Sequence, residues 1–153
     1  MRVWRICSRR HAETAFSGLG SKRAGGRWTP PGHLAVYTAQ HTSTAILEML
    51  AHMEPAHFGV GFVLIAADLP DATTFENIAV ADLPKDWRTL QDAPELQRIG
   101  LKWLKRGEHS ALRVPSALVP SECNFILNPD HPDFAKIEIH PPEPLVFDPR
   151  LIR

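Results

Sequence analysis

The pattern of apolar and polar positions predicts a chain built mainly from short strands. Residues 2–6 alternate, with Val3 on one side and Trp4 and Ile6 on the other, as in a half-buried strand. Further short apolar runs bounded by turn residues predict strands at 33–39, 58–70, 111–120, 123–129, 135–140 and 144–148. The 14 prolines gather in the connections, where their fixed φ and missing N–H are tolerated. We therefore expect an α+β fold whose short strands form a mixed or antiparallel sheet, with a few helices.

Two segments have helical periodicity instead. Residues 41–53 carry an i, i+3, i+4, i+7 apolar stripe made of Ile46, Met49, Leu50 and Met53. The residues that could cap this helix are Thr42, Ser43 and Thr44. The pattern at residues 93–110 predicts a second helix with a basic end. Residues 8–31 are rich in Gly, Ser, Arg and Lys, and this composition predicts one long functional loop.

Composition narrows the class of protein. A chain of 153 residues fits one domain, here 1–153, and its 17 basic and 17 acidic residues leave no net charge to attract nucleic acid or an anionic membrane. No apolar run approaches the roughly 20 residues of a membrane span, and the N-terminus lacks the apolar core of a signal peptide. Cys7 and Cys123 have no zinc-type spacing and suit a reducing compartment. We expect a cytoplasmic protein, with its oligomeric state, a homo-oligomer included, left open.

The helix at 41–53 also carries a carboxylate that needs interpretation. Glu48 lies nearly opposite the apolar stripe, on the side of His41, Ala45 and His52, which by itself predicts a solvated helix face. A zincin-type pair of histidines and a third ligand are missing, so no metal site is expected there. The chain also has neither the GxxxxGK[ST] nor the GxGxxG phosphate motif. Cys123 is expected to be a thiol in the core and not a nucleophile.

An ordered set of motifs changes this interpretation. The sequence places GGRWTPPGHLAVYTA at 25–39, then a helix with LEML, then RVPS, and then NFILNPDHPDF. In this order they resemble the RES-domain toxin family, which is named for a characteristic Arg, Glu and Ser. The resemblance runs from VWRI near the N-terminus to EPLVFD near the C-terminus, and so covers almost the whole chain. Thr29 followed by two prolines departs from the pattern of many relatives.

The resemblance implies an ADP-ribosyltransferase-like fold and the toxin half of a bacterial toxin–antitoxin pair that degrades NAD⁺. It implies a catalytic set of Arg27, Tyr37, Glu48 and Ser116. It adds Asn124 as a substrate-binding residue, and Arg5 matches a recurrent family arginine whose role is open. On the residue types alone, Trp28 is the second candidate after Tyr37 for stacking on the substrate. NAD⁺ would be the substrate rather than a resident cofactor, with no metal. The implied partner is an Xre-like helix-turn-helix antitoxin, which would bind DNA in place of this neutral chain.

The residue types suit that chemistry. A fixed carboxylate can stabilise the oxocarbenium-like ribose that forms when the nicotinamide–ribose bond breaks. A guanidinium matches a pyrophosphate, an aromatic ring stacks on the cationic nicotinamide, and a serine hydroxyl can donate to a phosphate or ribose oxygen. The ribosyl acceptor, water or phosphate, stays open. Two alternatives remain: transfer of ADP-ribose to a protein, and a non-catalytic module that only binds a nucleotide or a partner.

Overall fold

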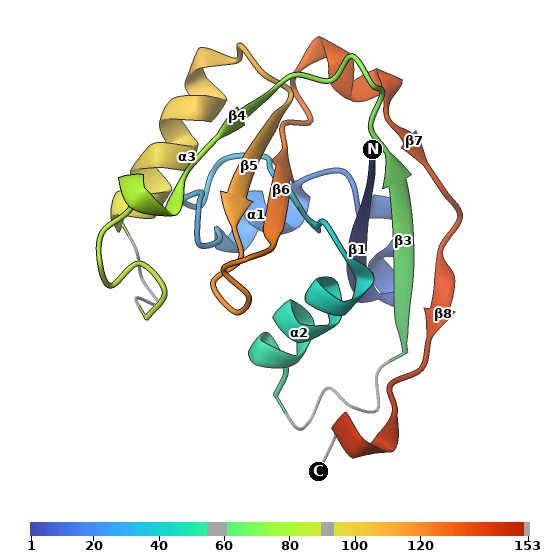
Figure 1. Ribbon diagram of the computed structural model, residues 1–153. Helices are drawn as coiled ribbons and strands as arrows, with labels where there is room; N and C mark the ends of the chain where they lie inside the picture. The colour runs from blue at the N-terminus through green and yellow to red at the C-terminus, as the bar shows by residue number, and fades with distance from the viewer. Residues whose placement is uncertain (55–60, 90–93, 152–153) are drawn as a thin grey trace.

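The computed structural model describes residues 1–54, 61–89 and 94–151 (Figure 1). The strands are β1 (Arg2–Ser8), β2 (Val36–Ala39), β3 (Phe62–Asp68), β4 (Phe75–Asn77), β5 (Ala111–Pro115), β6 (Cys123–Leu127), β7 (Glu138–Ile139) and β8 (Glu143–Leu145). The α-helices are α1 (Leu19–Ala24), α2 (Thr42–His52) and α3 (Pro94–Arg106). Short 3-10 helices occur at η1 (Arg9–Thr14), η3 (Val80–Asp82), η4 (Pro132–Lys136) and η5 (Pro149–Leu151). The α+β prediction is confirmed, and each predicted strand and helix has a counterpart, although residues 58–60 and 93 of those predictions lie outside the described part.

One mixed sheet organises the molecule. Its strand order is β4-β5-β6-β2-β1-β3-β7, and β8 also pairs with β3. Only the β4–β5 pair is parallel among the described pairings. β1 pairs with β3 along its whole length, from Arg2 opposite Asp68 to Ser8 opposite Phe62. Its pairing with β2 is much shorter and consists of a single register pair, Trp4 opposite Ala39. The sheet therefore consists of two halves, β4-β5-β6-β2 and β1-β3 with β7 and β8, joined at a narrow junction.

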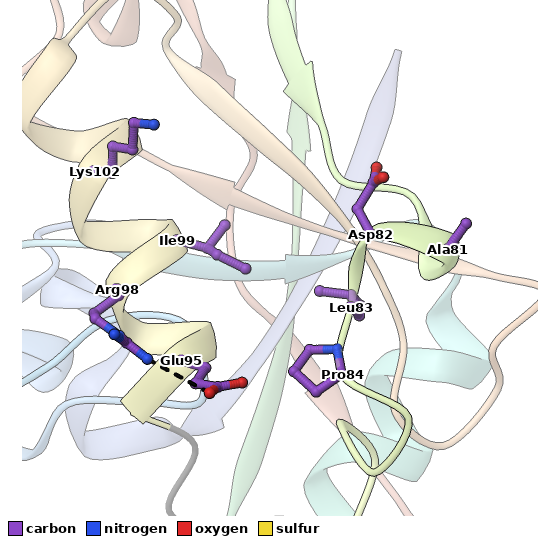
Figure 2. A pocket seen from close by; sticks show the side chains of 8 residues that line it. All are labelled: Ala81, Asp82, Leu83, Pro84, Glu95, Arg98, Ile99 and Lys102. Carbon is purple, nitrogen blue, oxygen red and sulfur yellow. Dashed lines mark ion pairs between the residues drawn. The ribbon is translucent and has the colours of Figure 1, made fainter.

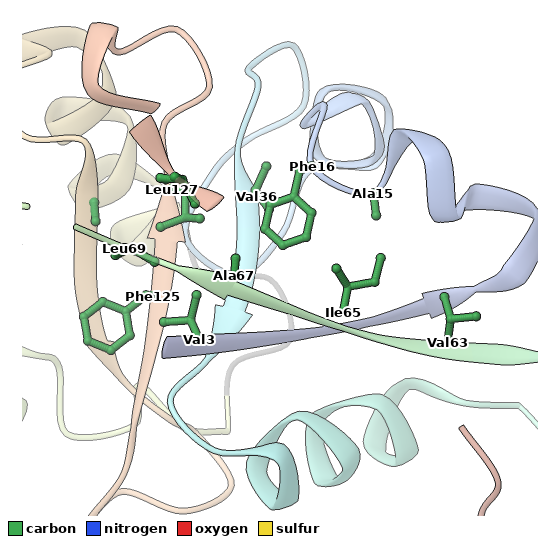
Figure 3. Packing of buried hydrophobic residues seen from close by; sticks show 12 residues of the cluster. Val3, Ala15, Phe16, Val36, Val63, Ile65, Ala67, Leu69, Phe125 and Leu127 are labelled. Carbon is green, nitrogen blue, oxygen red and sulfur yellow. The ribbon is translucent and has the colours of Figure 1, made fainter. Parts of the chain in front are cut away.

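The first core covers the face of the sheet opposite α2. Alternate strand residues, including Val3, Val36 and Ile65, point to this side and meet Phe16, which follows η1 (Figure 3). Ile137, at the end of η4, completes the cluster. The predicted alternation in β1 is confirmed, because Val3 joins this core while Trp4 and Ile6 pack on the other side.

Two further cores lie on the face that carries α2 and α3. Where α3 packs on the sheet, three of the four tryptophans are buried, namely Trp28, Trp87 and Trp103 of α3 itself, at 3%, 4% and 1% exposure. Beneath α2, the predicted stripe is confirmed at Ile46, Met49 and Met53, which pack on Ile6, Ala39 and Phe62. In Figure 1, α3 lies alongside β4 and β5, whereas α2 lies nearer β1.

The main sequence-based error concerns residues 8–31. This segment is not one long loop, because it contains η1 and α1, both too short to give a clear helical period. The helix start at α2 was also predicted wrongly: its N-cap is His41, without a side-chain cap bond, and Thr44 is instead completely buried. Cys7 and Cys123 are free, partly buried thiols. Within the described residues, no helix is both long and apolar enough to cross a membrane.

Candidate functional site

Glu48 is held by two side chains from other elements. From α2, its Oε1 accepts a hydrogen bond from the Ser116 hydroxyl at 2.8 Å and another from Asn124 Nδ2 at 2.8 Å. Ser116 follows β5 directly, and Asn124 lies in β6, so residues 68 and 76 positions apart in the chain converge on one carboxylate oxygen. Hydrogen bonds to a charged acceptor are among the stronger ones in proteins. The structure thus brings three of the candidate residues into direct contact.

The prediction of a solvated face for Glu48 was wrong. His41 and His52 are exposed as expected, but Ala45 is only 7% exposed and Glu48 itself is half-buried. A helical wheel contains no information about neighbouring elements, and here the loop between β5 and β6 covers the side of α2 that the wheel assigns to solvent. The resemblance to the toxin family, not the periodicity, identified Glu48.

Ser116 has a fixed hydroxyl orientation. Its side chain is fully buried, and its Oγ accepts the backbone N–H of Leu118 at 3.2 Å and of Val119 at 3.1 Å. A serine hydroxyl has one proton and two acceptor sites. With both acceptor sites filled, the proton is directed to Glu48. Ser116 is therefore placed to orient the carboxylate, rather than to donate to a phosphate or ribose oxygen as the residue type had suggested.

The second oxygen of Glu48 differs from the first. Among the described residues, Oε2 receives no hydrogen bond, and it is not one of the buried unpartnered atoms, so it is open to solvent. Asn124 Oδ1, in contrast, is buried without a partner in the described part of the chain. One carboxylate oxygen is thus fixed to the protein, and the other is available to a hydroxyl group from outside.

The geometry of the GGRW turn requires glycine at both of its first two positions. Gly25 adopts φ +70°, a region that disfavours other residues. A Cβ on Gly26 would lie 2.6 Å from the Tyr37 hydroxyl oxygen, so only glycine lets the turn approach that ring. Gln97 of α3 also donates to the Gly26 carbonyl at 3.0 Å. The turn is therefore fixed against both β2 and α3.

Tyr37 is bonded into this turn. Its hydroxyl accepts the Trp28 backbone N–H at 3.1 Å and shares a hydrogen bond with the Thr29 hydroxyl at 2.9 Å. Burial raises the pKa of Tyr37 above its ordinary value, and the bonds to Thr29 and Trp28 and the nearby Arg27 charge offset only part of this shift. The phenol is therefore neutral at physiological pH.

Arg27 is half-buried and contacts the chain after η3. Its Nη1 donates to the Trp87 carbonyl at 2.8 Å, and its Nη2 lies 3.5 Å from the Arg88 carbonyl. Arg88 in turn donates through Nε to the Ala117 carbonyl at 2.8 Å, one residue beyond Ser116. Residues 87–88 therefore connect the Arg27 turn with the loop that carries Ser116. No motif in the sequence indicates this link, because the acceptors are backbone carbonyls.

The register of β2 and β6 relates the two groups of residues. Tyr37 lies opposite Ile126, and Ala39 lies opposite Asn124, so Tyr37 and Asn124 share one face of the sheet. Diagonal neighbours of this kind are about 7 Å apart. The Arg27–Tyr37 group and the Glu48–Ser116–Asn124 group are therefore adjacent on the face that also carries α2 and α3.

Two other candidates occupy different positions. Trp28 packs in the core beneath α3 with 3% of its surface exposed, which leaves little of the ring for a ligand. Arg5 donates through Nη1 to the Tyr37 carbonyl at 2.7 Å, while its Nε is buried without a partner in the described residues. Burial lowers the pKa of the Arg5 guanidinium. Arg5 thus supports β2 behind Tyr37.

A separate surface hollow of about 500 Å³ lies between α3 and residues 81–84 (Figure 2). Its walls include Leu83, Ile99 and Lys102, together with Glu95 and Arg98, which form an ion pair at 3.6 Å. None of the candidate residues lines it. The hollow is therefore distinct from the Glu48 site.

The fold and the site together define an α+β protein with a carboxylate fixed at the junction of helix and sheet. A family model described as RES domain matches residues 2–148, and the chain belongs to this family of toxins. It is 35% identical over 152 residues to "Toxin Res" of Yersinia enterocolitica, covering 99% of both chains. It is 32% identical over 158 residues to "Prs ADP-ribosylating toxin" of Sphingobium sp., covering 98% of this chain and 96% of the relative.

A solved structure confirms the fold. The chain matches one in the crystal structure of the M. tuberculosis MbcT-MbcA toxin-antitoxin complex with a TM-score of 0.80, covering 95% of this chain and 84% of that one. The sequence identity is 18%, so this likeness concerns the fold.

Proposed function

We propose that this toxin degrades NAD⁺ by breaking its nicotinamide–ribose bond. The observation that carries the proposal is the state of the Glu48 carboxylate, with Oε1 bonded to Ser116 and Asn124 and Oε2 open to solvent. A carboxylate held in this way does not need to reorganise when positive charge develops nearby, which is the main requirement for stabilising an oxocarbenium-like ribose. Glu48 Oε2 would accept a ribose hydroxyl and face that charge.

The adjacent group of residues suits the rest of the dinucleotide. Arg27 supplies a guanidinium whose planar donors match the pyrophosphate, and Gly25 and Gly26 allow close backbone approach. Binding would exchange contacts to the Trp87 and Arg88 carbonyls for contacts to charged phosphate oxygens. Tyr37, neutral and half-buried, would stack on the nicotinamide without adding charge. Ser116 and Asn124 act through Glu48.

The leaving group simplifies the catalytic requirement. Nicotinamide leaves as a neutral molecule when the bond to the ribose breaks, so no protein acid has to protonate it. The bond electrons stay with the nicotinamide nitrogen, and the ribose carbon then takes an oxygen from water or inorganic phosphate. A single oriented carboxylate therefore suffices where other glycosidic cleavages need a carboxylate pair.

We also propose that an antitoxin of the Xre-like helix-turn-helix type restrains this chain. The related fold was solved as a toxin-antitoxin complex, which supports an antitoxin partner; the helix-turn-helix type comes from the family resemblance. The zero formal net charge is consistent with DNA binding by the partner and not by the toxin. Co-expression with the adjacent gene product followed by co-purification tests this; a toxin that expresses alone without harming its host would contradict it.

A second candidate is transfer of ADP-ribose to a protein. The name of the Sphingobium relative, an ADP-ribosylating toxin, favours it. The same bond of NAD⁺ breaks, but a side chain of another protein takes the ribosyl group in place of water or phosphate. The two reactions are distinguished by whether the ADP-ribose part of labelled NAD⁺ becomes attached to protein.

The decisive experiment follows NAD⁺ and its products by proton and phosphorus NMR, with and without inorganic phosphate. Wild type is compared with Glu48→Ala and Arg27→Ala, and with the controls Glu143→Ala and Arg98→Ala, which remove exposed groups elsewhere. We expect nicotinamide release by wild type and both controls, and its loss in the two site variants. Phosphate dependence would identify the acceptor.

Three results would contradict NAD⁺ degradation as proposed. Intact NAD⁺ after incubation with the folded toxin alone, but nicotinamide release and labelled protein once a protein substrate is added, would establish the transfer reaction. Intact NAD⁺ and no labelled protein would favour a binding module. Full activity of Glu48→Ala would show that bond cleavage does not use this site.

A further inference from the structure

The contacts of α2 with the β5–β6 loop contain a second pair one turn away from Glu48. Thr44 precedes Glu48 by four residues, so the two side chains lie on the same side of the helix. The Thr44 hydroxyl donates to Glu122 Oε2. Neither residue belongs to the Arg27, Tyr37, Glu48 and Ser116 set.

Thr44 is placed unusually for a helix residue. It is completely buried, with 0% exposure, and its hydroxyl points outward to the loop instead of capping the helix. A buried hydroxyl without a partner carries a desolvation cost, so the Glu122 carboxylate satisfies a real requirement. An apolar residue of the same shape would fill this position at no such cost, which suggests that the bond itself is the reason for the threonine.

Glu122 is at the base of the loop that carries Ser116. The Ser116 backbone N–H donates to the Glu122 carbonyl at 3.0 Å, and the Glu122 N–H donates to the Val119 carbonyl at 2.8 Å. These bonds close the loop on itself. Its position relative to α2 is then set by side-chain bonds from both ends, Glu122 to Thr44 and Ser116 to Glu48.

We propose that Thr44 and Glu122 are positioning residues that set the distance between α2 and the Ser116 loop, and hence the placement of Glu48. They do not touch the substrate. With the pair intact, Glu48 Oε1 reaches Ser116 and Asn124 together and Oε2 faces outward. Without it, the helix can shift along or away from the loop, and a displacement of about 1 Å at a catalytic group can lower kcat by about 100-fold. The inference rests on the proposed NAD⁺ chemistry.

The test compares four variants of the full chain in NAD⁺ turnover. Thr44→Val keeps the shape and removes the hydroxyl, and Glu122→Ala removes the acceptor, whereas Thr44→Ser and Glu122→Gln keep a donor and an acceptor. We expect the first two to lower kcat by about 10- to 100-fold, with KM changed by less than about 3-fold, since uniform substrate binding is intact. The conservative pair should stay within about 3-fold of wild type. Thr14→Val and Glu143→Gln, exposed at other places, are the matched controls.

Each result has one meaning. An unchanged kcat in Thr44→Val and Glu122→Ala would overturn the proposal, as would a raised KM with unchanged kcat, which indicates direct substrate contact. Failure of Thr44→Ser to restore what Thr44→Val loses would also overturn it. If Thr44→Val does not fold, Glu122→Ala, which loses a partly exposed group, carries the test.

Growth arrest separates this proposal from the proposed function. If wild type leaves NAD⁺ intact, the NAD⁺ chemistry fails, and the pair is judged by arrest of a bacterial host on expression. Relief of arrest by Thr44→Val and Glu122→Ala, as by Glu48→Ala, with arrest retained by Thr44→Ser and Glu122→Gln, would still support positioning. Equal arrest by all four variants would overturn it.

Discussion

At the residue scale, the site depends on how one carboxylate oxygen is held. Ser116 and Asn124 both donate to Glu48 Oε1, and two backbone N–H groups fix the Ser116 hydroxyl. The motif resemblance supplied the identity of these residues, but the sequence could not show that Ser116 is buried beneath the carboxylate. Because its proton is directed to Glu48, we expect Ser116 to orient the carboxylate and not to contact the substrate.

Ser116→Ala distinguishes these roles. Because Ser116 is fully buried and its proton goes to Glu48, we expect kcat for NAD⁺ consumption to fall by about 10-fold, with KM nearly unchanged. Steady-state kinetics at several NAD⁺ concentrations measure both constants. Ser121→Ala, at an exposed position of the same loop, is the control. A raised KM with an unchanged kcat would contradict this role and indicate that Ser116 binds the substrate directly.

Tyr37 gives a direct spectroscopic test, because it is the only tyrosine of the chain. Burial raises its pKa, so the folded protein should show phenolate absorbance only at a pH above the ordinary value of about 10. Stability from the neutral phenol is fully present below that pH and is lost as the pH rises through the folded-state pKa. An ultraviolet titration of native and urea-unfolded protein measures the difference. Coincident curves would show that the ring is solvated.

At the element scale, α3 depends on a glycine for its position. A Cβ on Gly100 would lie 1.8 Å from the Trp28 carbonyl oxygen, which is rigid backbone. The helix therefore approaches the GGRW turn more closely than any other residue at this position permits. This contact couples the packing of α3 to the shape of the turn that carries Arg27.

Gly100→Ala should destabilise the fold for this reason. We expect a loss of about 3 kcal/mol in the free energy of unfolding, the upper part of the range for overpacking. Gly20→Ala is a matched control, since Gly20 lies in α1 with nothing within 4 Å of an added Cβ; it should be neutral or stabilising by up to about 1 kcal/mol. Urea unfolding followed by tryptophan fluorescence measures both. Equal stabilities for the two variants would contradict the tight contact.

The elements themselves could be predicted where one period dominates. β1 and α2 each carry several apolar residues at regular spacing, and both appear within a few residues of the expected bounds. β4 (Phe75–Asn77) and α1 were missed, because three or six residues hold too few turns of either period. The prediction that Glu48 is solvated failed for a different reason. The side of α2 that carries Glu48 is covered by a loop more than 60 residues later in the chain, which the helical period cannot show.

At the scale of the whole molecule, a group of charged and polar side chains connects β1, β3 and the segment after β7. Asp68, at the end of β3, accepts two bonds from Arg2 of β1 at 2.7 Å each and one from His140, after β7, at 2.7 Å. Glu138 lies close enough for a metal-ligand arrangement with Asp68 and His140. Arg2, Asp68 and His140 thus form a network of one bidentate ion pair and one hydrogen bond, which joins the first strand to the C-terminal segment.

This network predicts how stability depends on pH. The Arg2 and His140 bonds hold the pKa of Asp68 well below its ordinary value. Its contribution is therefore present above the unfolded-state value of about 4 and is lost as the pH falls toward the lower folded-state pKa. We expect Asp68→Asn to melt at a lower temperature than wild type at pH 5, and the difference to shrink below about pH 4. A difference that does not depend on pH would contradict the charged network.

The narrow junction between β1 and β2 has a consequence for how the molecule opens. With Trp4 opposite Ala39 as their one register pair, few backbone hydrogen bonds join the two half-sheets, and side chains complete the connection. Protection of backbone amides against hydrogen exchange should therefore fall into two groups, one for β5 and β6 and one for β1 and β3, which open with different free energies. A dinucleotide bound across the junction would slow exchange in both groups together, and would make two cooperative units behave as one.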